Sequence, residues 1–261
     1  MSPKEFLSKF SLANCKRPLR RFGAAKDGGY ILVDHRLEEI RRVYSYGIGG
    51  ETSFEEAILE VLPECAVFGL DPTIEGVPWL DHEARFKFAK LGLACGTGTL
   101  LEHRAQFGDK DEPFIVKADV EGAEVPWLLN EMPGSQCKQI VMELHGLETP
   151  EKWPAIAGAL DNLRAGFALV HAHVNNYADP CFTKYRALSV PSTLELTFLR
   201  YSLLGPGAEP NKRPLPVPGL DFSNNPQIPD PPLNGWPWQK AICGPGDTAA
   251  PVITIMQPDE D

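Results

Sequence analysis

The sequence lacks several features that would place it in a functional class at once. It contains neither the G-x-S-x-G turn of many serine hydrolases nor the G-x-x-x-x-G-K-[ST] loop that binds nucleotide phosphates. No apolar run approaches the roughly 18 residues of a membrane span, and the first residues lack the apolar core of a signal peptide. The six cysteines form no C-x-x-C pair and are too widely spaced for a zinc ribbon or a dense disulfide scaffold. We therefore expect a reducing, cytoplasmic setting and no contact with membranes.

The chain also has a shortage of positive charge. Its 25 Lys and Arg residues face 35 Asp and Glu residues, which gives a formal net charge of -10. Because neutralising phosphates requires a basic surface, this balance argues against a nucleic-acid partner. The one basic cluster, residues 16–21, is interpreted as a solvated face. A small molecule is the expected partner, and the oligomeric state stays open.

Proline is distributed unevenly and suggests three parts. Of the 25 prolines, 13 lie between Gly205 and Asp261, a density that excludes helices and central strands. The prediction is an N-terminal segment over residues 1–42 that packs on the core, a main domain over 43–204, and a proline-rich extension over 205–261. Part of the extension is expected to lie against the body through its apolar side chains, namely Phe222, Trp236, Trp238 and Ile242.

The main domain alternates short apolar runs with helix-like stretches. Helices are predicted over 52–62, 123–132 and 153–165, the first with capping boxes that pair Thr52 with Glu55 and Ser53 with Glu56. This alternation predicts an α/β fold, a Rossmann-like and mostly parallel sheet with helices on both faces and a ligand crevice at the carboxyl ends of its strands. The seven strands are predicted over 43–46, 66–70, 86–89, 114–118, 140–144, 167–174 and 194–199.

Two features at the first strand ends indicate a nucleoside-containing ligand. The first strand ends in Gly47-Ile-Gly-Gly50-Glu51, where glycines let a ligand approach the backbone closely. Asp71 follows 21 residues after Gly50, at the end of the second strand, where a carboxylate can accept ribose hydroxyls. Asp71 can also be interpreted as a turn cap ahead of Pro72.

Carboxylates gather after the fourth predicted strand. The segment Lys117-Ala-Asp-Val-Glu-Gly-Ala-Glu124 places Asp119 and Glu121 toward the crevice, while Glu124 can also be interpreted as a residue that complements a helix dipole. Negative charge attracts the sulfonium and ammonium groups of S-adenosylmethionine and repels the diphosphate of NAD. The electrostatics therefore favour a methyl donor over a dinucleotide.

Taken with Ile140-Val-Met-Glu-Leu-His145, the segment 117–124 resembles the FkbM-type methyltransferases. The stretches Asp27-Gly-Gly-Tyr30 and Tyr44–Phe54 resemble a related methyltransferase-like branch, and Gly69-Leu-Asp-Pro72 supports both by order and spacing. The resemblance spans about residues 20–200. It implies a seven-stranded sheet that binds S-adenosylmethionine, with Gly47, Gly49, Asp71 and Asp119 near the cofactor, and O-methylation of a small-molecule or sugar hydroxyl. The first strand departs from the pattern, because Ser45 stands where an acidic residue often precedes the glycine turn; Glu51 is a candidate substitute.

Candidate catalytic groups lie at the later strand ends. Methyl transfer to a hydroxyl requires alignment and a base, so His145 is the first choice, with His173 second and Glu143 beside them. Each histidine can equally be a hydrogen-bonded residue bordering the sheet. Asp119, Glu143, His145 and His173 offer oxygen and imidazole ligands for a divalent metal, but spacing does not establish that they converge, and no metal is predicted. Aromatic candidates for lining an acceptor site are Phe22, Tyr30, Trp79, Trp127 and Tyr177.

Two other functions stay open on sequence grounds. An NAD-dependent oxidoreductase would use the same turn and Asp71, although Thr52 stands where the third glycine of G-x-G-x-x-G belongs. A binding protein that keeps this fold without catalysing a reaction is the other, because a fold does not determine an activity.

Overall fold

A computed structural model gives the structure of the chain. It describes residues 1–93, 98–109, 111–177, 182–185, 188–205, 209–211, 215–230, 233, 236–237, 240–245 and 251–256.

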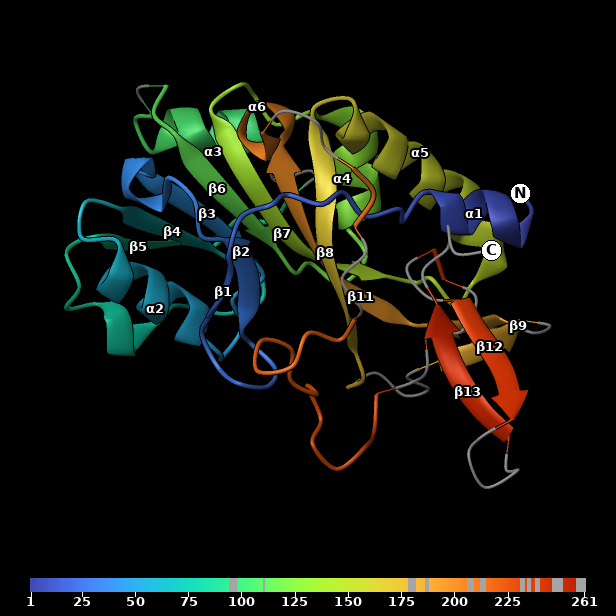
Figure 1. Cartoon of the computed structure of the whole chain (residues 1–261). Coiled ribbons are helices and arrows are strands. Elements are labelled where there is room, and N and C mark those ends of the chain that lie inside the picture. The colour runs from blue at the N-terminus through green and yellow to red at the C-terminus, as the bar shows by residue number, and fades with distance from the viewer. Residues whose placement is uncertain are drawn as a thin grey trace.

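A seven-stranded mixed sheet forms the centre of the molecule (Figure 1). Its order is β5-β4-β3-β6-β7-β11-β8, and only β11 runs antiparallel, between β7 and β8. This arrangement confirms the predicted α/β class. The first five strands follow the doubly wound order, and the inserted antiparallel strand departs from the six-stranded dinucleotide-binding sheet. The strands are β3 (Arg42–Tyr46), β4 (Ala66–Leu70), β5 (Phe86–Ala89), β6 (Phe114–Ala118), β7 (Cys137–His145), β8 (Phe167–Asn175) and β11 (Thr193–Arg200).

Helices cover both faces of the sheet, as the alternation predicts. One face packs on α2 (Ser53–Val61), and the other packs on α3 (Leu100–Gln106), α4 (Glu124–Asn130) and α5 (Trp153–Arg164) (Figure 1). The N-terminal helix α1 (Pro3–Ser8) lies beside α5, where Phe6 stacks on Trp153 with ring centroids 4.5 Å apart. A short α6 (Tyr201–Leu204) follows the sheet, and single 3₁₀ turns occur at Leu37–Glu39, Pro78–Leu80 and Pro150–Lys152. No described helix is both long and apolar enough to cross a bilayer.

The capping boxes predicted for α2 are wrong. Thr52 is the N-cap, but its hydroxyl makes no cap hydrogen bond and instead donates to Glu56 at 2.7 Å. The Ser53 hydroxyl accepts from the Ala24 amide at 2.8 Å, and Glu51 accepts the Ser53 amide at 2.6 Å. A tertiary contact therefore uses the Ser53 hydroxyl, and a side chain one turn further along the helix uses the Thr52 hydroxyl.

A hairpin precedes the sheet and lies over its β7–β11 half. It consists of β1 (Leu19–Phe22) and β2 (Tyr30–Val33), paired antiparallel. The Gln139 side chain holds it by accepting from the Val33 amide at 2.8 Å and donating to the Val33 carbonyl at 2.9 Å. The Thr197 hydroxyl donates to the Ile31 carbonyl at 2.7 Å. The hairpin and α2 thus share one face of the sheet.

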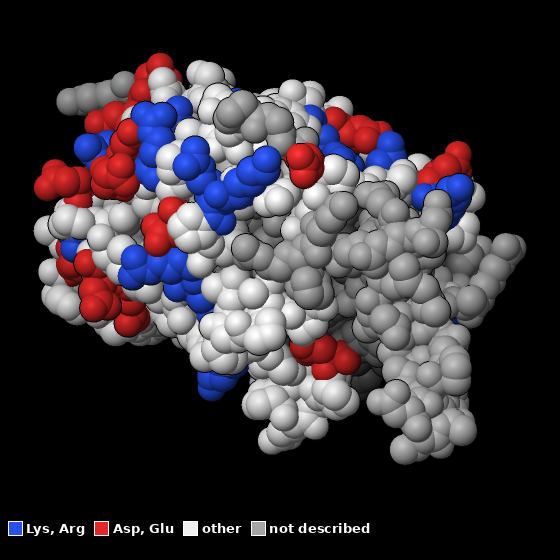
Figure 2. Space-filling model, in the orientation of Figure 1, with Lys and Arg blue, Asp and Glu red and all other residues white. Residues whose placement is uncertain are grey.

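In the part of the extension that the structure describes, β12 (Lys240–Pro245) and β13 (Pro251–Met256) form a two-stranded ladder. A second small ladder joins β9 (Phe182–Tyr185) to β10 (Leu188–Pro191). Trp236 is fully buried and donates to the Ser189 carbonyl at 2.8 Å, whereas Phe222 is 38% exposed. Trp238 lies outside the described residues. On the face shown in Figure 2, basic and acidic side chains gather in small groups of both signs.

Candidate functional site

A cavity of about 360 Å³ opens at the carboxyl ends of β3, β4 and β6. This is the point where the chain, after building β4 and β5 on one side of β3, returns to build β6 on the other, and ligands bind at such switch points. We call this space the main cavity. All seven residues predicted to bind a cofactor line it, namely Gly47, Gly49, Gly50, Glu51, Asp71, Asp119 and Glu121.

The three glycines of the turn are there for different structural reasons. A Cβ on Gly47, whose φ is +70°, would stand 1.6 Å from the Asp119 carbonyl oxygen. Gly47 is therefore required where the ends of β3 and β6 meet. A Cβ on Gly49 or Gly50 would meet nothing within 4 Å. These two positions leave open space for a ligand.

Asp71 both caps a turn and lines the main cavity. Its Oδ1 accepts the Thr73 amide at 2.7 Å and the Thr73 hydroxyl at 2.6 Å, and its Oδ2 accepts the Gly49 amide at 2.9 Å. Burial raises the pKa of Asp71, but the hydrogen bonds from Thr73 and Gly49 outweigh burial and lower it below its ordinary value. Since a carboxylate has about four acceptor positions, Oδ2 keeps one for a further donor.

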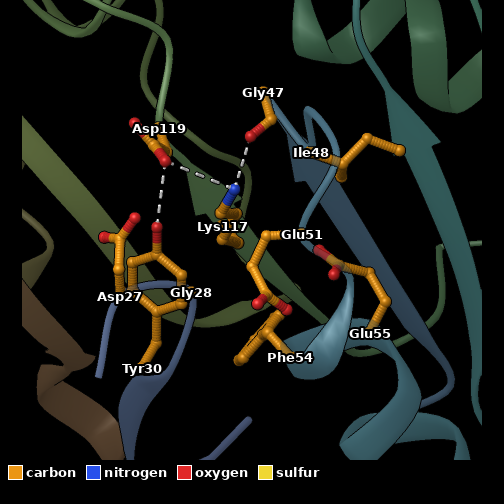
Figure 3. Close-up of a pocket in the computed structure, with 10 residues that line it drawn as sticks. All are labelled: Asp27, Gly28, Tyr30, Gly47, Ile48, Glu51, Phe54, Glu55, Lys117 and Asp119. Carbon is orange, nitrogen blue, oxygen red and sulfur yellow. Dashed lines mark hydrogen bonds and ion pairs between the residues drawn. The ribbon is translucent and has the colours of Figure 1, made fainter. Parts of the chain in front are cut away.

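A smaller space of about 50 Å³, the inner chamber, adjoins the main cavity and is drawn in Figure 3. The two share Gly47, Ile48, Glu51 and Asp119. Lys117 is buried here; its Nζ donates to the Gly47 carbonyl at 2.7 Å and lies 3.7 Å from Asp119. The chamber therefore offers one cation among several carboxylates.

The sequence did not reveal the role of Glu55, which lines the inner chamber. Its carboxylate, fully buried, accepts a hydrogen bond from the Ser45 hydroxyl. Burial raises the pKa of Glu55, and the nearby Lys117 charge opposes that rise. A carboxylate from α2 thus contacts Ser45, the β3 position where the sequence lacks an acidic residue. The signal was present in the sequence, but a capping interpretation accounted for Glu55.

Beyond Asp119 the carboxylates continue onto β7. The Tyr30 hydroxyl lies 3.1 Å from Asp119 and 3.3 Å from Glu143, and Asn175 donates to both Glu143 oxygens at 3.1 and 3.0 Å. Burial, and then the charges of Asp119 and Glu195, raise the pKa of Glu143 well above its ordinary range. The structure therefore brings Glu143 and Asp119 together around one tyrosine from the N-terminal hairpin.

His145 lies at the end of β7 among acidic residues. Its Nδ1 lies 3.0 Å from Glu124 Oε1, and its Nε2 lies 3.6 Å from Glu121 and 3.7 Å from Glu143. Burial lowers the pKa of His145, but Glu124, Glu143 and Glu121 outweigh burial and raise it to about 9. His145 is therefore charged at neutral pH, and a role as general base would require that it first lose this proton.

His173 is not among the residues that line either space. Its Nδ1 lies 3.4 Å from Glu195 and its Nε2 lies 3.3 Å from Asp230 of the extension. A neighbouring pair, His171 and Asp221, joins the same two segments at 2.8 Å. His173 is thus a hydrogen-bonded histidine at the border of the sheet. It does not line the main cavity or the inner chamber, so its predicted catalytic role has no support from the cavity lining.

The predicted aromatic liners are mostly elsewhere. Tyr30 lines the inner chamber. Phe22 and Trp127 are buried in the two cores, while Trp79 and Tyr177 are exposed. Packing in the cores therefore accounts for Phe22 and Trp127.

Comparisons with known proteins give a likeness in structure and none in sequence. No family model matches the chain, and no curated protein matches it. A fibrillarin pre-rRNA processing protein from Methanococcus jannaschii aligns over 64% of this chain and 69% of its own, with 9% identity and a TM-score of 0.40. A putative hemolysin from Streptococcus thermophilus aligns over 67% and 72%, with 13% identity and a TM-score of 0.40. A predicted O-methyltransferase from Agrobacterium tumefaciens aligns over 63% and 79%, with 13% identity and a TM-score of 0.36. Such distant likeness does not identify a reaction, so the function has to be argued from the residues of the site.

Proposed function

We propose that this chain is an S-adenosylmethionine-dependent methyltransferase of the FkbM-like type that acts on a hydroxyl of a small molecule or sugar. The observation that carries the proposal is the lining of the main cavity. It contains four carboxylates, from Glu51, Asp71, Asp119 and Glu121, and no Lys or Arg among the described residues that line it. A cavity with this charge suits a ligand that carries a sulfonium and an ammonium group.

Electrostatics separate the donor from a dinucleotide. Two unit charges about 4 Å apart interact by about 4 kcal/mol at an effective dielectric constant of about 20. A diphosphate beside Asp119 would therefore be repelled and a sulfonium attracted, while the exposed Glu121 adds a smaller effect of the same sign because solvent screens it. Thr52, which stands in place of the third glycine of G-x-G-x-x-G, also disfavours a dinucleotide.

Each side of the site has a distinct task in this proposal. The remaining acceptor position on Asp71 Oδ2 would take a ribose hydroxyl. The inner chamber would receive the amino-acid end of the donor, with Lys117 near its carboxylate and Glu51 and Glu55 near its ammonium group. S-adenosylmethionine supplies the methyl group when bound. Glu143 and His145, which lie near Asp119, would hold or take the acceptor proton.

Calorimetric titration with S-adenosylmethionine, S-adenosylhomocysteine and NAD tests the proposal. Both adenosyl ligands should bind and NAD should not. Asp71→Ala should weaken adenosyl binding about ten- to hundredfold, because a hydrogen bond to a charged group contributes about 1.5–3 kcal/mol. Asp81→Ala, at an exposed aspartate, is the matched control and should bind like the wild type.

Thermal unfolding of the wild type and of each variant shows that the proteins compared in the titration are folded. Absence of adenosyl binding by folded wild-type protein would refute the proposal. Tighter binding of NAD than of the adenosyl ligands would replace it with the oxidoreductase alternative. Binding without turnover on any hydroxyl acceptor would favour the non-catalytic alternative.

A further inference from the structure

Three side chains with metal-binding atoms converge beside the main cavity. One atom each from Asp119, Glu121 and His145 lies within 4.8 Å of the other two. Asp119 and Glu121 come from the loop after β6, and His145 comes from the end of β7, so two neighbouring strand ends build the cluster. We propose that these three residues form a binding site for a divalent cation.

The spacing suits one ion. Ligand atoms on opposite sides of an ion, each about 2.1–2.2 Å from it, are about 4.3 Å apart. The three ligand atoms, which lie within 4.8 Å of one another, therefore need to move by only a few tenths of an ångström to contact one ion. The Glu121 side chain is 88% exposed and free of packing that would oppose such a movement.

A buried carboxylate orients the histidine as second-sphere residues do in metal sites. Glu124 is fully buried, and its Oε1 lies 3.0 Å from His145 Nδ1. The other ring nitrogen, Nε2, then faces Glu121 and Glu143. Metal-bound histidines commonly donate their second N–H to a carboxylate in this way.

Within the described part of the chain, the Glu124 carboxylate behind the histidine is hydrogen-bonded through one oxygen only: Oε1 also lies 3.1 and 3.3 Å from the Val120 and Gly122 amides, which donate to it. The second oxygen of Glu124, Oε2, is buried and has no hydrogen-bond partner among the described residues. Burying a carboxylate without full compensation is costly. The carboxylates of Asp119, Glu121 and Glu124 around one imidazole leave an excess of negative charge that a divalent cation would balance.

The mixed ligand set indicates which ion to test. Carboxylates suit Mg²⁺ and Mn²⁺, and imidazole suits Zn²⁺ and other first-row ions. Mn²⁺ accepts both kinds of ligand, and its binding is directly visible by electron paramagnetic resonance. Ion binding would exchange the proton on Nε2 for the metal. If the chain is the methyltransferase proposed above, the ion would also offer an open position to an acceptor oxygen beside the donor.

The test is a Mn²⁺ titration of the full, chelator-treated chain without any donor, followed by the loss of the free-ion resonance signal. One ion per chain should bind. Glu121→Gln and His145→Gln should each weaken binding at least about tenfold, since even second-sphere changes reduce metal affinity about 10- to 100-fold. Glu75→Gln is the matched control, because Glu75 is also 88% exposed but lies away from the cluster, and His82→Gln, an exposed histidine, controls for the other change.

The outcomes separate this inference from the methyltransferase proposal. No Mn²⁺ uptake at millimolar concentration by folded protein overturns the metal site, as does binding that Glu121→Gln leaves unchanged. The donor titration, repeated in excess chelator, reports on the cofactor alone, so either proposal can fail while the other holds. A site that binds Mn²⁺ and is weakened only by the two cluster variants establishes the inference.

Discussion

His173 makes the stability of the chain depend on pH in a way that can be measured. The imidazole is 4% exposed and lies between Glu195 on β11 and Asp230 of the extension. Burial lowers the pKa of His173, but Asp230 and Glu195 outweigh burial and raise it to about 10. Because the folded chain holds this proton more tightly than the unfolded chain, protonation stabilises the fold.

The size of the effect follows from the two pKa values. With an unfolded pKa of about 6.5, the stabilisation is complete below about pH 6.5 and is lost as the pH rises through about 10. Linkage over this interval gives a loss of about 2.5 kcal/mol between pH 7 and pH 9. His145, whose pKa is raised to about 9, adds a loss of the same sign, but it does so equally in any variant that retains it.

The assay is urea unfolding followed by tryptophan fluorescence at pH 7 and pH 9, with wild type and His173→Gln compared. At pH 7 the variant should be less stable by about 3–5 kcal/mol, since it leaves the buried Glu195 and the partly exposed Asp230 without their cation. That gap should narrow by about 2.5 kcal/mol at pH 9. His82→Gln, an exposed histidine, should track the wild type. An equal gap at both pH values would show that His173 carries no excess proton, and the reasoning would fail.

Two further predictions concern the glycine turn and the extension. Gly47→Ala should destabilise the fold by at least about 2 kcal/mol, because the new Cβ would clash with the Asp119 carbonyl at a position with positive φ. Gly50→Ala should change the stability by no more than about 0.5 kcal/mol but weaken donor binding in calorimetry. Equal melting curves for the two variants would contradict this prediction. Trp236→Ala should cost about 3–5 kcal/mol in urea unfolding, because the ring is fully buried, bonded to Ser189 and in edge contact with Phe10; an unchanged midpoint would show that the burial of Trp236 does not stabilise the fold.

The sheet and the cavity could be predicted because each rests on a local signal. Apolar runs of four to nine residues mark the strands, and parallel strands bring their carboxyl ends to one edge. Asp71 and Asp119 therefore line one cavity although 48 positions separate them in the sequence. The helix α3 was missed, although Thr99 and Glu102 form the capping box that marks its start.

The partners of the polar side chains could not be predicted, since they depend on contacts distant in sequence. Asp221 and Asp230 reach β8 from 50 and 57 positions away, and no periodicity indicates that pairing. Glu55 illustrates a different failure, because the pattern fitted a cap and the tertiary contact with Ser45 prevailed. Likewise, His145 was predicted to act as a base, but the carboxylates of Glu124, Glu143 and Glu121 together raise its pKa to about 9.

The antiparallel strand β11 links the extension to the candidate site. Its register places Glu195 opposite Glu143 on one side and opposite His173 on the other, so the three side chains form a row across one face of the sheet. Asn224 of the extension donates to Glu195 at 2.6 Å, and the charge of Glu195 is among the causes that raise the pKa of Glu143. Removing the extension would therefore expose Glu195 to water and weaken the charge effect felt by Glu143. The proline-rich extension is on this argument a part of the electrostatic environment of the site, although no residue of it that the structure describes lines the main cavity.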